Sequence, residues 1–141
     1  MLLDEEELAA WRGMLRAHAA LVRTLDAELA REHDMPLSSY EVLLFLNDSD
    51  QGRMRMSELA DSVLLSRSGL TRLVDRLERQ GLLKRERCDS DARGLFAEIT
   101  PEGRTAFAAA RKTHLDGVRR AFLSRFSRAE LRTLGGLWAK L

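Results

Sequence analysis

Arginine, serine and threonine side chains gather on one face of an expected helix, where they could contact a nucleic acid. Polar residues alternate with an apolar stripe at three- and four-residue spacing, formed by Leu70, Leu73, Val74 and Leu77. The opposite face carries Arg67, Ser68, Thr71, Arg72, Asp75 and Arg79. A guanidinium can bind guanine O6 and N7 through two hydrogen bonds, and a hydroxyl can bind a base or a phosphate. An ordinary helix with a solvated charged face has the same pattern, so this helix alone leaves both interpretations open.

A basic hairpin expected after this helix favours the nucleic-acid interpretation. Residues 82–86 and 95–99 are predicted strands, and the turn-rich residues 88–94 form a long tip between them. Residues 66–93 hold eight basic and five acidic side chains. An arginine at the tip, Arg93, could enter a narrow minor groove, where the potential is most negative. Asp91 would hold a nearby arginine in place through a salt bridge.

The helices that must position these residues have recognisable starts. Capping boxes, in which an N-terminal side chain is followed three residues later by glutamate, are expected at Asp4, Ser38 and Ser127. Ser66 would cap the arginine-bearing helix, which should end at Gly81. The predicted helices cover residues 4–33, 38–46, 57–63, 66–81, 100–123 and 127–141. Residues 47–52 are expected to be a polar loop.

The order of these elements predicts a winged helix-turn-helix. A short helix, a tight turn, a second helix and a hairpin follow one another, and in this motif the second helix enters the major groove of DNA. The fold class is therefore mainly α with a small two-stranded β wing. The length of 141 residues fits a single domain, and 45% hydrophobic residues suffice for a core.

Charge is distributed unevenly along the chain although the net charge is only +1. Residues 1–50 have a net charge of −7 and residues 105–141 a net charge of +6. Opposite charges predict that the two ends pack together, within a subunit or across a dimer, although two separately solvated faces would show the same asymmetry.

Several segments resemble the signature of the MarR family. They are residues 56–60, 66–83, 91–94 and 95–103, including the Asp-x-Arg of the wing and the Ile-Thr-Pro-Glu-Gly that follows it. The resemblance is strong over residues 35–104. It implies a DNA-binding lobe at 35–100, and N- and C-terminal helices at 1–34 and 101–141 that interleave in a homodimer. It also implies a ligand-responsive repressor on a pseudo-palindromic operator in double-stranded DNA.

The resemblance assigns roles to individual residues. DNA contacts from the recognition helix are expected at Ser66, Arg67, Ser68, Thr71 and Arg72. Arg93 is the expected wing contact, and Asp91 is expected to position it.

A small aromatic or phenolic anion is a further partner that the resemblance implies. Members of the family often bind such ligands where the dimerisation helices meet the DNA-binding lobe. Trp11, His18 and Tyr40 are the candidates to line this site, but aromatic residues at helical spacing are also typical of an ordinary core.

Other kinds of chemistry have little support in the sequence. His18, His33 and His114 are far apart, so no metal site is expected, and neither a phosphate-binding glycine loop nor a nucleophile–base pair appears. We therefore expect no enzyme and no cofactor. The single cysteine, Cys88, fits a reducing compartment, and it is a candidate redox switch because neighbouring arginines would favour its thiolate. The alternative is a wing residue with no redox role, since peroxide-sensing members of the family that the chain resembles have their reactive cysteine in the first helix.

The expected location is cytoplasmic. The N-terminus is acidic, unlike a secretory signal, and no apolar run approaches the roughly 20 residues of a membrane span. Two alternatives to the DNA-binding regulator remain. One is a small-molecule or redox sensor of the same fold with a weak role at DNA, and the other is a helical protein–protein interaction module.

Overall fold

The computed structural model describes residues 2–63, 67–88 and 91–141. Its helices are α1 (Glu5–His33), α2 (Leu37–Asp48), α3 (Met56–Val63), α4 (Arg67–Arg79), α5 (Pro101–Ala121) and α6 (Arg128–Trp138). Its strands are β1 (Arg53–Arg55), β2 (Leu83–Cys88) and β3 (Asp91–Ile99). Short 3-10 turns occupy Asp50–Gly52 and Leu123–Arg125. The predicted class, mainly helical with a small antiparallel sheet, is confirmed.

Two of the three predicted capping boxes are present. The side chains of Asp4 and Ser127 each accept a hydrogen bond from the backbone three residues later, and the glutamate there bonds back. The box predicted at Ser38 is wrong, because α2 begins one residue earlier, after Pro36. Pro36 is therefore the N-cap residue, and it makes no side-chain hydrogen bond to the first turn. The Leu37 N–H then donates to Asp26 Oδ1 of α1 at 2.7 Å, which ties α2 to α1.

The sheet has three strands in the order β1-β3-β2, all antiparallel, rather than the predicted two. The extra strand, β1, has only three residues, too few for an alternating pattern to be recognised. The long tip predicted at residues 88–94 is also wrong, because Cys88 of β2 pairs with Asp91 of β3. Cross-strand pairing overrides the turn propensity of these residues, and a register shift between Arg87 and Cys88 accommodates the change.

One hydrophobic core holds α2, α3, α4 and the sheet together. The four residues of the predicted stripe on α4 are all buried: Leu70, Leu73, Val74 and Leu77. They pack with Leu43, Leu46 and Leu59 of the two preceding helices and with Leu83 and Ile99 of the sheet. Burial of this stripe fixes the rotation of α4 about its axis. The opposite, polar face of α4 is therefore held toward solvent.

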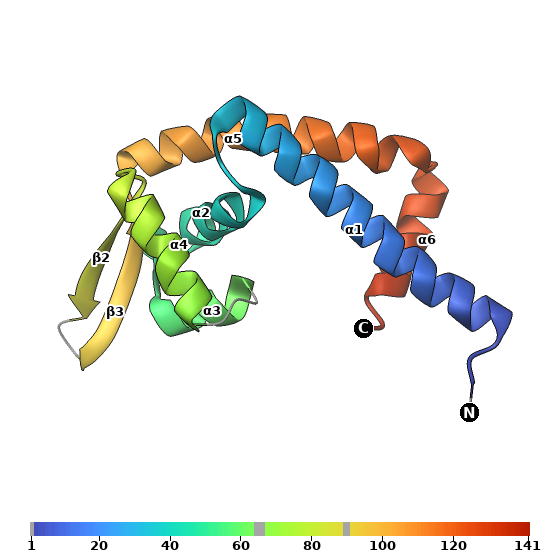
Figure 1. The fold of residues 1–141 in the computed structure, drawn as a ribbon, viewed down its shortest axis with the longest axis horizontal. Coiled ribbons are helices and arrows are strands. Elements are labelled where there is room, and N and C mark those ends of the chain that lie inside the picture. Colours follow the sequence, from blue (N-terminus) through green and yellow to red (C-terminus); the bar gives the residue numbers. More distant parts are fainter. Residues whose placement is uncertain (1, 64–66, 89–90) are drawn as a thin grey trace.

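Two long helices, α1 and α5, extend away from this lobe (Figure 1). They pack on each other near the lobe, where His33 bonds Thr113 at 2.7 Å and Arg120 pairs with Glu28. The N-terminal half of α1 and the whole of α6 lie on the side remote from the sheet (Figure 1). In the described part of the chain, no helix is long and apolar enough to cross a membrane.

Candidate nucleic-acid interface

The outward face of α4 carries the predicted contact residues that the structure describes. Ser68, Thr71 and Arg72 are all exposed, opposite the buried stripe. Arg67 is the first residue of α4, but its side chain lies outside the described part, and Ser66 lies outside it altogether. The structure thus brings three of the five predicted helix residues to one accessible surface.

The two carboxylates of α4 are both bound by one arginine of β2. Arg85 Nη2 lies 2.7 Å from Asp75 Oδ1 and 2.9 Å from Glu78 Oε1, and the Arg85 N–H donates to Glu78 Oε2 at 2.9 Å. Hydrogen bonds from Arg85 hold the pKa of Glu78 below its ordinary value. The contact locks the hairpin to α4 and neutralises the negative charges of this helix. In the sequence, Arg85 is one of the eight basic residues of positions 66–93, and no local pattern indicates that it pairs with Asp75 and Glu78.

Other charges of the hairpin are also paired. Lys84 bridges Glu86 at 2.8 Å and Glu98 at 3.2 Å on the outer face of the sheet. These hydrogen bonds, first that to Glu86, raise the pKa of Lys84. On the same face the guanidinium of Arg53 lies 4.3 Å from the ring centre of Phe96, a cation–π contact. The base of the wing is therefore a charge-balanced surface.

The tip of the wing carries the remaining predicted residues. Arg93 and Asp91 belong to the start of β3, at the end of the hairpin that is remote from α5 (Figure 1). Their side chains, and that of Cys88, lie outside the described part of the structure. The minor-groove contact of Arg93, its positioning by Asp91 and a redox role for Cys88 stay predictions.

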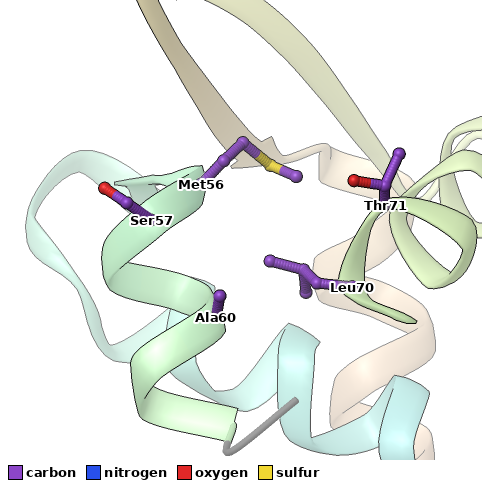
Figure 2. A pocket seen from close by; sticks show the side chains of 5 residues that line it. All are labelled: Met56, Ser57, Ala60, Leu70 and Thr71. Atoms are coloured by element: carbon purple, nitrogen blue, oxygen red, sulfur yellow. The ribbon is translucent and has the colours of Figure 1, made fainter. Parts of the chain in front are cut away.

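A small hollow separates α3 from α4 (Figure 2). Met56, Ala60 and Leu70 point into it, together with the hydroxyl of Thr71, while the hydroxyl of Ser57 points away. Its volume is about 200 Å³. Cavities that hold drug-sized ligands measure roughly 300–1,000 Å³, so this hollow is small for an effector.

The three residues predicted to line a ligand site occupy different surroundings in the protomer. Tyr40 is buried and stacks on Phe107, with ring centres 5.3 Å apart. Trp11 and His18 are exposed on α1. Trp11 precedes Leu29, the buried residue of α1, by eighteen positions, which is about 27 Å of helix. A shared site would need a second chain, and the ligand site stays a prediction.

His114 is a partly buried residue whose proximity to Tyr40 no sequence pattern indicated. Their ring centres are 4.5 Å apart, and His114 Nδ1 has no hydrogen-bond partner among the described residues. Burial lowers the pKa of His114. Burial thus favours the neutral form of the ring at the junction of α2 and α5. Within the described residues, no group of three or more His, Cys, Asp or Glu side chains could hold a metal ion.

Comparison with known proteins places this geometry among transcriptional regulators. The model of the MarR family matches residues 33–94. The Bacillus subtilis HTH-type transcriptional regulator YfiV is 32% identical over 74 residues, which are 52% of this chain and 45% of YfiV. YkoM from the same species is 26% identical over 122 residues, or 84% of this chain and 78% of YkoM. The chain thus spans less than half of YfiV.

Two solved structures from Streptomyces coelicolor are similar over nearly the whole chain. Sco3205, a MarR family transcriptional regulator solved in complex with DNA, is 37% identical with a TM-score of 0.92, covering 99% of this chain and 87% of its own. AbsC is 34% identical with a TM-score of 0.90, covering 97% of this chain and 92% of its own.

Proposed function

Because the chain belongs to the MarR family of transcriptional regulators, we propose that it binds duplex DNA through α4 and the wing, without enzymatic activity. The observation that carries the proposal is the exposed face of α4, where Ser68, Thr71 and Arg72 lie opposite a buried stripe. An α-helix with its side chains is about 10–12 Å across and the major groove about 12 Å wide, so α4 fits it.

Each contact residue has a role in this proposal. Arg72 binds a guanine edge, while Ser68 and Thr71 serve bases or phosphates near the start of α4, the part of a recognition helix that contacts bases. Ser66 and Arg67 extend this surface. Arg93 enters the adjacent minor groove, held by Asp91. The DNA complex of Sco3205 supports the assignment, since that protein has nearly the same fold.

The proposed active form is a homodimer in which residues 1–34 and 101–141 make the interface and residues 35–100 the DNA-binding lobe. Large apolar side chains remain exposed on α1, on α6 and in the segment just before α6: Trp11, Leu15, Val22, Phe126, Leu137 and Trp138. A net charge of −7 over residues 1–50 and of +6 over residues 105–141 adds electrostatic complementarity. Two-fold symmetry would place two copies of α4 about 34 Å apart on a pseudo-palindromic operator, where binding represses transcription.

Selection of duplexes from a random library, followed by fluorescence anisotropy, tests this function. We expect a pseudo-palindromic sequence to be enriched. Arg72→Ala should weaken binding to it by about 1–3 kcal/mol and relax the base preference, because a bidentate contact is lost. Lys112→Ala, which removes an exposed charge from α5, should have little effect. Failure to enrich any sequence over the starting library would count against sequence-specific binding.

A further inference from the structure

A basic hollow lies between the flank of α4 and the N-terminus of α2. It is lined by Ser38, Gly69, Arg72, Leu73, Arg76 and Arg79, and its volume is about 310 Å³. Three arginines thus border one space on the flank of α4. Because Ser38 precedes the arginines by more than thirty residues, only the folded chain assembles this site.

The arginines of this hollow are available to an external anion. Among the described residues, none of the three arginine side chains has an ion pair or a hydrogen bond. The carboxylates of α4 that could have neutralised them, Asp75 and Glu78, are both held by Arg85. The positive potential is therefore not cancelled from within the helix.

The N-terminus of α2 adds a hydroxyl to this site. Asp26 of α1 already accepts the first N–H of the helix, that of Leu37, at 2.7 Å, but the Ser38 hydroxyl has no hydrogen-bond partner among the described residues. Backbone N–H groups at a helix N-terminus carry partial positive charge, and they bind phosphate in many proteins. The Ser38 hydroxyl and the three arginines together form a donor set suited to a tetrahedral oxyanion.

The position of the hollow indicates where this anion would come from. Arg76 and Arg79 lie in the last turn of α4, whereas bases are contacted by the first turns of a recognition helix. Because a helix nearly fills the major groove, its flanks and its far end face the walls of the groove, and those walls are the phosphate backbone.

We propose that Ser38, Arg76 and Arg79 form a binding site for a phosphate group of the DNA backbone. Arg72 borders this site and also contacts a base. This inference rests on the proposed DNA-binding function and deepens it. The site fixes the depth and register of α4 in the groove, since phosphate contacts position a protein without specifying sequence. A free phosphate group has the same chemistry, and the experiment must separate the two sources.

The test measures DNA affinity against salt concentration for Arg76→Gln, Arg79→Gln and the double variant. The probes are a mixed-sequence 30-base-pair duplex and the duplex enriched by selection. Each lost phosphate contact should reduce the slope of log K against log salt by about 0.9. Each single variant changes both protomers of the proposed dimer, so it should reduce this slope by about 1.8. The affinity lost between 50 and 200 mM salt should then be roughly 12-fold smaller for each single variant than for the parent. The loss should be equal on both duplexes, because phosphates are the same in every sequence.

Lys112→Gln is the matched control, because it removes one exposed positive charge from α5. Thermal unfolding of all variants verifies that they fold. If the parent binds DNA and both arginine variants keep its salt slope, as Lys112→Gln should, the phosphate site is overturned while the proposed function stands. If the parent binds no duplex at any salt concentration, both the proposed function and the phosphate site are refuted.

Calorimetric titration of the DNA-free protein with inorganic phosphate separates the sources. We expect no saturable binding below millimolar concentrations, because a single phosphate lacks the rest of the backbone to hold it. Saturable binding that Arg76→Gln abolishes, combined with an unchanged DNA salt slope, would assign the hollow to a free phosphate and overturn the backbone assignment.

Discussion

Replacement of Arg85 by glutamine should weaken DNA binding even though this side chain points at α4 rather than at a groove. Arg85 is held against Asp75 at 2.7 Å and Glu78 at 2.9 Å. Without it, two uncompensated carboxylates lie on the helix proposed to enter the major groove. The variant thus tests whether neutralisation of α4 by the wing is part of DNA recognition.

The expected magnitudes follow from the exposure and geometry of this cluster. Each partly exposed ion pair contributes about 0.2–1 kcal/mol, so the fold should lose roughly 0.5–2 kcal/mol of unfolding free energy. A carboxylate about 8 Å from a DNA phosphate, in water, is repelled by roughly 0.5 kcal/mol before screening. Two carboxylates, each near one or two phosphates, give about 1–2 kcal/mol, or a roughly 5- to 30-fold loss of affinity.

The assay is fluorescence anisotropy at about 50 mM salt, where surface charges are least screened. The decisive companion is the triple variant Arg85→Gln, Asp75→Asn, Glu78→Gln, which removes the freed carboxylates as well. We expect its DNA affinity to return to within about threefold of the parent, because the repulsion is gone. Circular dichroism melts report the stability of each variant separately.

A triple variant that binds as weakly as Arg85→Gln alone would refute this reasoning. It would mean that Arg85 acts through a DNA contact of its own or through the placement of the wing. An unchanged affinity of Arg85→Gln at low salt would refute it equally, since the carboxylates would then not face the DNA.

Three further predictions concern the scaffold. Gly103→Ala should lower the unfolding free energy by about 2–3 kcal/mol or more in thermal melts, because a Cβ there would lie 1.9 Å from the Leu82 carbonyl oxygen, whereas Gly13→Ala meets nothing within 4 Å. Burial lowers the pKa of His114 below its ordinary 6.5, so as the pH falls the unfolded chain binds a proton at this residue at a higher pH than the folded chain does. The free energy of unfolding should therefore decrease as the pH drops below about 6.5. The melting temperature of His114→Phe should change less between pH 7.5 and 5.5. Leu137→Asp should convert the dimer to monomers in light scattering, and an unchanged mass would contradict the proposed interface.

Local patterns predicted much of this fold. The stripe on α4 identified its buried face, since helical periodicity reports directly which side meets a core. The capping boxes predicted at Asp4 and Ser127 are present, because a capping box joins residues only three positions apart and so depends on local sequence alone. At Ser38 the same pattern failed, because Pro36 starts α2 earlier and Asp26 of α1 takes the next N–H, a contact that no local pattern contains.

The candidate site was only partly predictable for a related reason. Exposure of Ser68, Thr71 and Arg72 followed from the period of α4. The pairing of Arg85 with α4 depends on how the hairpin packs, and the hollow at Ser38 depends on how α2 crosses α4. Such features arise from tertiary packing, and charge counts along the chain do not contain them.

Binding of the full-length protein to its selected duplex as salt is raised tests the central claim most directly. A dimer that contacts six or more phosphates should lose about 10³-fold or more in affinity between 50 and 200 mM salt, while it still prefers its selected sequence to a mixed one. No binding to duplex DNA at 50 mM salt, or an affinity that does not change with salt, would contradict the account.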